Sequence, residues 1–287
     1  MKFNEIHIRD PFVLVEDGKY YMYGTRGETC WGPATGFDVY VSEDLENWSQ
    51  PITVFENDGS FWADLNYWAP EVHKYNGKYY MFASFKRADV CRGTQILKAD
   101  TPLGPFEPIS DGPVTPRQWE CLDGTLYVED GTPYIVFCHE WVQCKDGEMC
   151  ALRLSDDLTK AVGDAVVLFR ASSFKNVKSV RNDEDGWYVT DGPFMYRTQS
   201  GKLIMIWSSL SKNGGYCELI SCSDNGKIDG KWSCDEKTLF EKDGGHGMIF
   251  TALDGKKYYI AHAPNNTPNE RPKLFEITET NDTLELV

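Results

Sequence analysis

The sequence lacks the long apolar runs that mark membrane and secreted proteins. None of its segments approaches the roughly 18 apolar residues of a membrane-spanning helix. The first residues, MKFNEIHIRDPF, contain no apolar core like that of a signal peptide. We therefore expect a cytoplasmic protein without membrane association. Amphipathic helical periodicity is also lacking along the chain, which disfavours a helical fold.

Regularly spaced cysteines and an excess of positive charge are lacking as well. The nine cysteines are odd in number and form no C-x-x-C pair, so a structural zinc site is not expected and free thiols are. The 44 Asp and Glu residues outnumber the 29 Lys and Arg residues, giving a net charge of -15. This balance disfavours nucleic-acid binding, which requires a stripe of Lys and Arg.

Aromatic residues and turn formers are abundant. The chain has 15 Tyr, 15 Phe and 9 Trp, together with 25 Gly and 14 Pro. This composition is typical of a strand-rich protein with many turns. It also suits a carbohydrate-binding protein, and composition alone does not separate the two interpretations.

One short pattern, a turn with Gly followed by an aromatic-rich strand, recurs five times. The copies are GKYYMYGT at Gly18, GKYYMFAS at Gly77, GTPYIVFCHE at Gly131, GKLIMIWSS at Gly201 and GKKYYIAHA at Gly255. A second apolar run precedes each turn, and polar stretches that end in an aromatic residue follow several copies, as in SEDLENW. Four strands repeated five times predict an all-β fold, a five-bladed β-propeller with four antiparallel strands per blade. The alternative is a β-sandwich whose hairpins are similar by chance.

No linker or change of composition divides the chain, so residues 1–287 are predicted to form a single propeller domain. An ionisable residue precedes the turn of each repeat, by 8, 6, 8, 10 and 9 residues. These residues are Asp10, Glu71, Asp123, Asp191 and His246. Because the first strand of a propeller blade lines the axis, we expect the five side chains to meet there. An Asp beside Pro or Gly is also a common turn former, so the prediction depends on their shared register.

Four carboxyl groups at one centre would have unequal acidities. Like charges buried together push pKa values apart, and a general acid and a general base require such a difference. Cleavage of a glycosidic bond uses this pair: one carboxylic acid protonates the leaving oxygen while another carboxylate activates water.

At these residues the sequence resembles glycoside hydrolase family 43. The matching motifs, in order, are IRDPF, YWAPEV, CLDGTLY, TDGPFMYR and GGHGMIF, and they cover nearly the whole chain. The resemblance implies a five-bladed propeller that hydrolyses arabinose- or xylose-containing glycans with inversion at the anomeric carbon. It implies no cofactor for the chemistry.

The resemblance also implies roles for individual residues. Asp10 would be the general base, and Asp123 would tune and hold the general acid. His246 matches a histidine that in many family members contacts a calcium ion or its waters in the channel. The general acid of the family is normally a Glu, whereas this chain has Asp191 in D-G-P.

Three alternatives follow from this departure. Asp191 is the acid, or another carboxyl, Glu71 or Glu140, replaces it, or the site is a non-catalytic sugar binder. Candidate sugar contacts are Trp31, Trp68, His139, Trp141 and Arg271. A Trp wedged between blades, or an Arg in a surface ion pair, is the alternative interpretation of each.

The leading hypothesis is an inverting glycosidase that takes a small-molecule carbohydrate, with short oligosaccharides favoured by the expected cytoplasmic location. A non-catalytic sugar-binding propeller and a five-bladed glycosidase of different sugar specificity are the alternatives. A propeller that serves as a protein-interaction platform is disfavoured by the register of the acids. The sequence leaves the sugar, the linkage, exo or endo action and the oligomeric state open.

Overall fold

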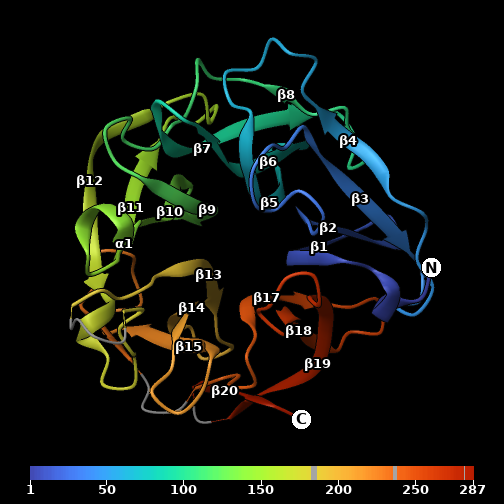
Figure 1. Cartoon of the computed structure of the whole chain (residues 1–287). Helices are drawn as coiled ribbons and strands as arrows, with labels where there is room; N and C mark the ends of the chain where they lie inside the picture. Colours follow the sequence, from blue (N-terminus) through green and yellow to red (C-terminus); the bar gives the residue numbers. More distant parts are fainter. Residues whose placement is uncertain (182–185, 235–237, 281) are drawn as a thin grey trace.

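A computed structural model describes residues 1–181, 186–234, 238–280 and 282–287. Within these residues, five four-stranded antiparallel sheets follow one another along the chain and stand as blades around a central axis (Figure 1). The predicted five-bladed β-propeller with four strands per blade is confirmed. No described helix has the length and the apolar character required to cross a membrane.

Each blade contains four strands in the order of the sequence. Blades one and two comprise β1 (Ile8–Glu16), β2 (Lys19–Arg26), β3 (Gly36–Ser42), β4 (Ile52–Glu56), β5 (Leu65–Tyr75), β6 (Lys78–Arg87), β7 (Val90–Ala99) and β8 (Glu107–Pro108). Blade three comprises β9 (Cys121–Glu129), β10 (Thr132–His139), β11 (Glu148–Leu154) and β12 (Ala161–Arg170). Blades four and five comprise β13 (Asp191–Arg197), β14 (Leu203–Leu210), β15 (Tyr216–Ser223), β16 (Trp232–Cys234), β17 (Gly245–Thr251), β18 (Lys257–Ala263), β19 (Arg271–Thr280) and β20 (Thr283–Leu286). The short helices are η1 (Phe3–Glu5), α1 (Trp141–Cys144) and η2 (Ala171–Ser173).

The repeated glycine closes the hairpin between the first two strands of each blade. In the first three blades it follows Asp17, Asn76 or Asp130, and both residues of each pair have positive φ. Two positive φ values are the signature of a tight type I′ turn, which Asn-Gly and Asp-Gly favour. The aromatic strand behind the turn is then buried, and β6 for example has seven consecutive buried residues.

The aromatic side chains lie mainly between blades. Phe37, Phe55, Tyr67 and Phe85 form a buried cluster where the first two blades meet, with ring centroids 4.8–6.3 Å apart. Trp207 is buried in the same way in the fourth blade. Most of the aromatic content therefore serves the core.

The innermost strand of every blade is interrupted by the same kind of β-bulge, in which two residues face one residue of the next strand. The first bulge residue has a φ between 47° and 56° in all five blades. The pairs are Asp10 with Pro11, Ala69 with Pro70, Asp123 with Gly124, Gly192 with Pro193 and His246 with Gly247. These first bulge residues are therefore the equivalent positions of the five blades.

Two of the predicted register positions are wrong. Ala69, not Glu71, holds the equivalent position in the second blade, and Gly192, not Asp191, holds it in the fourth. Counted from the bulges, the spacing to the repeated glycine is nearly constant, at 8, 8, 8, 9 and 9 residues. The pattern common to all five bulges is Pro or Gly at the second position, rather than an ionisable first residue.

Each bulge is tied to the preceding blade by one hydrogen bond. The backbone N–H of every first bulge residue donates to a side chain of that blade, over 2.7–3.2 Å. The acceptors are His262 for Asp10, Thr25 for Ala69, Ser84 for Asp123, Asp123 for Gly192 and Ser208 for His246. These five bonds form a closed ring around the axis, and they satisfy backbone donors that the bulge removes from the sheet ladder.

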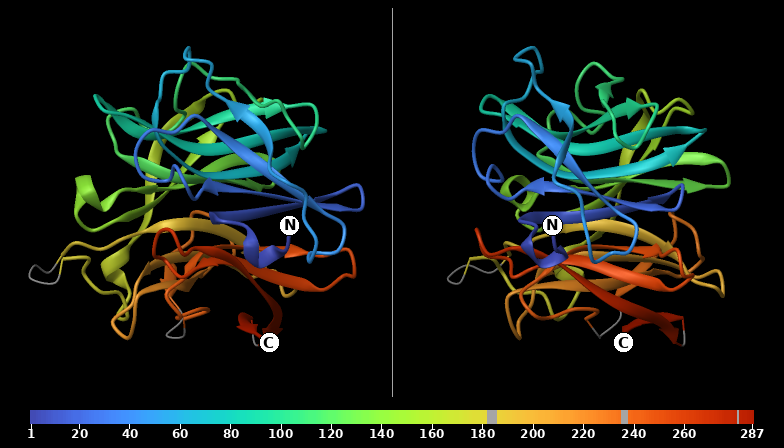
Figure 2. Two further views of the ribbon diagram at one scale, coloured as in Figure 1. Left: turned by 45° about the vertical axis from the view of Figure 1, so that its right-hand side comes forward. Right: turned by 90° about the vertical axis from the view of Figure 1, so that its right-hand side faces the viewer.

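The same ring closes the chain's first blade on its last. β1 lies against both β5 and β17, and Figure 2 shows the blue first blade beside the red fifth blade from two sides. The backbone N–H of Leu253 donates to the Tyr20 hydroxyl across this seam at 2.9 Å. No strand is exchanged between the two blades in the described residues, so side-chain contacts hold the seam.

Removing one hydroxyl of the ring is expected to destabilise the fold. Ser84→Ala leaves the buried N–H of Asp123 without its acceptor, which should lower the free energy of unfolding in urea by about 1–3 kcal/mol. Ser84→Thr is the matched control, because Thr25 performs the same task in the first blade. Equal stability of the Ala and Thr variants would contradict this role.

Candidate active site

A small pocket of about 70 Å³ opens where the five innermost strands meet. Its lining residues come from all five blades: Arg9, Asp10, Trp31, Trp68, Leu122, Asp123, Asp191, Tyr216 and His246. Four of the five ionisable residues predicted for the axis are among them. Two of the predicted sugar contacts, Trp31 and Trp68, are also there.

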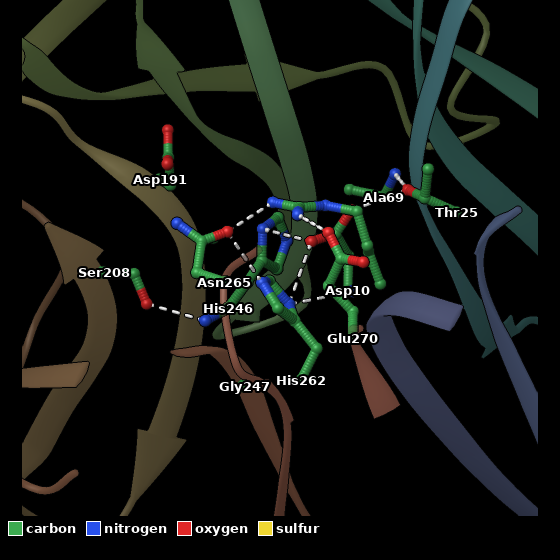
Figure 3. A network of polar contacts seen from close by, with 12 residues as sticks. Asp10, Thr25, Ala69, Asp191, Ser208, His246, Gly247, His262, Asn265 and Glu270 are labelled. Carbon is green, nitrogen blue, oxygen red and sulfur yellow. Dashed lines mark hydrogen bonds and ion pairs between the residues drawn. The ribbon is translucent and has the colours of Figure 1, made fainter. Parts of the chain in front are cut away.

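Asp10 lies at the first bulge, 9% exposed, with both carboxylate oxygens engaged (Figure 3). Thr25 donates its hydroxyl to Oδ2 at 2.6 Å, and His246 Nδ1 lies 3.2 Å from Oδ1. Burial alone would raise the pKa of Asp10, but the imidazole of His246 and the guanidinium of Arg9 help to hold it below the ordinary value. Asp10 is therefore ionised at neutral pH.

The second imidazole beside Asp10 is neutral. His262 is fully buried, and burial lowers its pKa to about 4. Its Nδ1 accepts the Asp10 N–H, so its proton belongs on Nε2, which faces Asn265 Oδ1 at 3.3 Å. His262 therefore positions the backbone of Asp10 rather than pairing with its charge.

Asp123 occupies the third bulge, 4% exposed. Its Oδ2 accepts the N–H of Gly192 at 3.0 Å and lies 3.7 Å from His246 Nδ1. Burial, followed by the nearby charge of Asp10, raises the pKa of Asp123 well above its ordinary value. Asp123 thus holds Gly192, the residue that follows Asp191, in place.

Asp191 stands apart from the Asp10 and His246 contacts in Figure 3. Burial, followed by the charge of Asp123, raises the pKa of Asp191 to about 7. Its Oδ2 accepts a hydrogen bond from the Tyr216 hydroxyl at 3.0 Å. The pocket therefore holds one carboxyl that is ionised and another that retains its proton near neutral pH.

Arg9 and Trp31 are held at the pocket by one buried carboxylate. Glu270 is fully buried, and its Oε1 accepts from Arg9 at 2.5 Å and from the Thr267 hydroxyl at 2.5 Å. Thr267 in turn accepts from the indole nitrogen of Trp31 at 2.9 Å. Trp31 is 59% exposed, so this chain of contacts orients an aromatic ring that solvent or ligand reaches.

Trp68 lies next to Trp31 and extends the aromatic wall of the pocket. Its indole nitrogen donates to the Cys30 carbonyl at 2.5 Å, and its ring meets Trp31 edge to face at 5.3 Å. The guanidinium carbon of Arg92 lies 3.7 Å from its ring centroid. A flat ring fixed in this way suits the apolar face of a sugar.

The two alternative acids do not line the pocket. Glu71 directly follows the bulge pair Ala69–Pro70 and is hydrogen-bonded to His73 Nε2 at 2.9 Å. Glu140 precedes α1 and pairs with Arg92 at 3.5 Å; burial raises the pKa of Glu140 despite that cation. Their predicted role as replacements for Asp191 has no support in this geometry.

Three predicted sugar contacts also lie away from the lining. His139 stacks on Trp119 and bonds Glu148 and Gln143. Trp141 meets Trp187 edge to face at 6.2 Å, and Arg271 donates to the carbonyl groups of Pro268 and Glu270. Contact of these three residues with a longer ligand stays a prediction.

Several site residues were missed by the sequence patterns. Arg9 directly precedes Asp10 in IRDP, and Glu270 directly precedes Arg271. Each of the two therefore adjoins a residue that the sequence did predict for the site. Thr25, Ser84, Ser208 and His262 each lie seven residues after a repeated glycine, a register that could have revealed them. Tyr216 lies in GGYCE and carries no comparable signal.

The residues around His246 do not fit a directly coordinated calcium ion. Calcium takes six to eight oxygen ligands, whereas His246 offers a nitrogen and contacts only the two carboxylates of Asp10 and Asp123 among the described ion pairs. The backbone N–H of His246 is bound by Ser208, whose hydroxyl donates to Glu218 Oε2 at 2.8 Å. Hydrogen bonds therefore account for the position of His246, and no step below uses a metal.

Comparison with known proteins agrees with this geometry. The family model of Glycosyl hydrolases family 43 matches residues 4–282. The solved structure of an endo-arabinase from Bacteroides thetaiotaomicron VPI-5482 is 38% identical, with a TM-score of 0.90 and 98% of each chain covered.

Two curated relatives are similar over shorter regions. The extracellular endo-alpha-(1->5)-L-arabinanase 1 of Bacillus subtilis (strain 168) is 27% identical over 48% of this chain and 45% of its own length. An arabinoxylan arabinofuranohydrolase of Paenibacillus polymyxa is 27% identical over 55% of this chain and 30% of its own length. The chain thus spans less than half the length of these curated relatives.

Glu218 provides a test of the hydrogen bonds behind His246. It is fully buried, and burial raises its pKa to about 7. A carboxyl whose pKa is raised on folding contributes stability below its unfolded pKa, and this contribution is lost as the pH rises through the folded value. Relative to wild type, Glu218→Gln should therefore gain up to roughly 3 kcal/mol in unfolding free energy between about pH 4.5 and 7.

The measurement is urea unfolding at several pH values. Glu43→Gln, at an exposed position, is the matched control and should follow wild type throughout. A constant difference between Glu218→Gln and wild type across this range would contradict the raised pKa of Glu218.

Proposed function

The chain belongs to glycosyl hydrolases family 43, and on this premise we propose that it is an inverting hydrolase of arabinose- or xylose-containing glycans. The observation that carries the proposal is the unequal acidity of two carboxyl groups in one pocket. Asp10 is held ionised, whereas the pKa of Asp191 is raised to about 7 by burial and by Asp123. These are the states that a general base and a general acid require.

The chemistry follows from these two residues. Asp10 takes a proton from a water molecule, whose oxygen attacks the anomeric carbon. Asp191 gives its proton to the glycosidic oxygen as that bond breaks. Because the water attacks from the face opposite the leaving oxygen, the new hydroxyl has inverted configuration. Asp123 holds the backbone next to Asp191 through the N–H of Gly192, and after burial it is the main group that favours the protonated form of Asp191. Carboxylate chemistry of this kind needs no cofactor.

Arabinan is the first substrate to test. The similar Bacteroides structure is described as an endo-arabinase, and the curated relatives are named for arabinan and arabinoxylan. The acidity of Asp191 gives no support to a non-catalytic sugar-binding propeller. A cytoplasmic location stays a prediction, and one of these relatives is named extracellular.

The proposal predicts a bell-shaped pH dependence of kcat/KM. The rate should fall about tenfold per pH unit above about 7, because Asp191 must be protonated, and should fall again at acidic pH, where Asp10 takes up a proton. Asp191→Ala should reduce cleavage of arabino-oligosaccharides far more than cleavage of an activated aryl arabinofuranoside, whose leaving group needs no proton. Asp10→Ala should abolish both activities. Equal inertness of wild type and both variants would refute the proposal.

Tyr216 is expected to position Asp191. Its hydrogen bond favours the ionised carboxylate, so Tyr216→Phe should raise the pKa of Asp191 and move the basic limb of the pH profile upward. The loss of a bond to a charged group should also lower kcat on oligosaccharides by about 10- to 100-fold. Tyr259→Phe removes a buried tyrosine hydroxyl that donates to Glu218 instead, and its basic limb should stay at the wild-type pH. An unshifted limb in Tyr216→Phe would contradict this role.

A further inference from the structure

A second cavity lies over the second blade, on the same edge of the propeller as the catalytic pocket. It measures about 230 Å³, and its walls include Trp62, Arg87, Arg92, Pro113 and Arg117. Leu65 at the start of β5 pairs with Lys86, and Arg87 pairs with Val90, so these segments lie at the edge where Trp68 stands. We call it the blade-two cavity.

Arg92 forms the partition between this cavity and the catalytic pocket. One side of it lines the blade-two cavity, while its guanidinium covers the ring of Trp68, which lines the pocket. Arg92 is only 7% exposed, and the Glu120 carboxylate accepts its backbone N–H at 2.7 Å. The stacked side chains of Arg92 and Trp68 therefore form the wall between the two spaces.

The far wall of the blade-two cavity is an aromatic ring held in place. The indole nitrogen of Trp62 donates to Gln95 Oε1 at 2.6 Å, and its ring contacts Phe61 and Phe85. Trp62 also lines an adjoining groove of about 640 Å³, so its ring faces a path that leads away from the pocket. Because the Trp62 ring is already held in place, a sugar that stacks on it loses little side-chain entropy on binding.

The third wall is a loop that is attached to β7. Val114 donates its N–H to the Thr94 carbonyl at 2.9 Å, and Ile109 donates to Ile96 at 3.2 Å. A Cβ at Gly93 would lie 2.5 Å from Pro113, so glycine alone allows this close approach. The cavity is therefore formed before any ligand binds.

The lining combines the groups that recognise sugars. Trp62 supplies an aromatic ring to the lining, and the lining residues Arg92, Arg117 and Asp111 carry the kinds of donor and acceptor groups that bind hydroxyl groups. The volume is slightly below the roughly 300 Å³ of the smallest pockets for drug-sized ligands, which suits one or two sugar rings.

From these observations we propose that the blade-two cavity is an outer sugar-binding subsite for a glycan chain whose cleaved bond lies in the catalytic pocket. This inference rests on the proposed function. It makes long chains better substrates than the short oligosaccharides that the sequence favoured, because a disaccharide in the pocket does not extend past Arg92 to Trp62.

Trp62→Ala tests the subsite by the dependence on chain length. The variant should lose about tenfold in kcat/KM on linear arabinan and long arabino-oligosaccharides, and nothing on an aryl arabinofuranoside. Trp62→Phe keeps a ring and should recover most of the loss. Tyr75→Ala, which removes an aromatic ring at the other end of β5 and lines neither cavity, should leave the dependence on chain length as in wild type.

Calorimetry separates failure of the subsite from failure of the proposed function. In an Asp10→Ala background, Trp62→Ala should weaken binding of a long arabino-oligosaccharide about tenfold and leave arabinobiose unchanged. If wild type cleaves arabinan and Trp62→Ala has no effect on long chains, the subsite is refuted while the function stands. If no protein cleaves any glycan but long chains bind in a Trp62-dependent way, the function fails and the subsite stands. Three results would overturn the subsite: an equal loss on all substrates, the same loss in Tyr75→Ala, or no binding of any chain.

Discussion

The structure depends on five hydrogen bonds that join the bulges of the innermost strands to the preceding blades. A bulge takes a backbone N–H out of the sheet ladder, and near the axis no solvent is free to satisfy it. Thr25, Ser84, Ser208 and His262 each supply an acceptor from the second strand of a blade. In the third blade, Cys138 occupies the position of these acceptors on the second strand. The N–H of Gly192 in the fourth blade is instead accepted by the carboxylate of Asp123, which lies in the bulge of the third blade. The fold and the site therefore share the same contacts.

Catalytic acidity is a consequence of this arrangement. Holding Asp10, Asp123 and His246 at positive φ costs roughly 1–2 kcal/mol each, and closing the ring buries their side chains together. Burial raises the pKa values of Asp123 and Asp191, whereas the basic groups next to Asp10 reverse the effect there. Local strain and desolvation thus produce two carboxyl groups of opposite protonation within one small pocket.

The aromatic side chains have two separate tasks that composition does not distinguish. Rings such as Phe37 and Trp207 are buried between blades and stabilise their packing. Trp31, Trp62 and Trp68 have their indole nitrogens fixed by Thr267, Gln95 and Cys30 and keep a ring face at a cavity. A ring fixed by its polar edge can bind a sugar without first being ordered.

The sequence by itself determined the propeller, because five copies of a hairpin with fixed turn chemistry permit few other folds. It also placed Asp10, Asp123, Asp191 and His246 near the axis. It misaligned the second and fourth blades because ionisable residues were matched, whereas the bulge requires Pro or Gly at its second position and accepts Ala69 or Gly192 at its first. Only the tertiary structure decided the partners: Tyr216 reaches Asp191 from the third strand of its blade, and Glu270 reaches Arg9 from the other end of the chain. Such contacts depend on how blades close around the axis, and no local pattern encodes that closure.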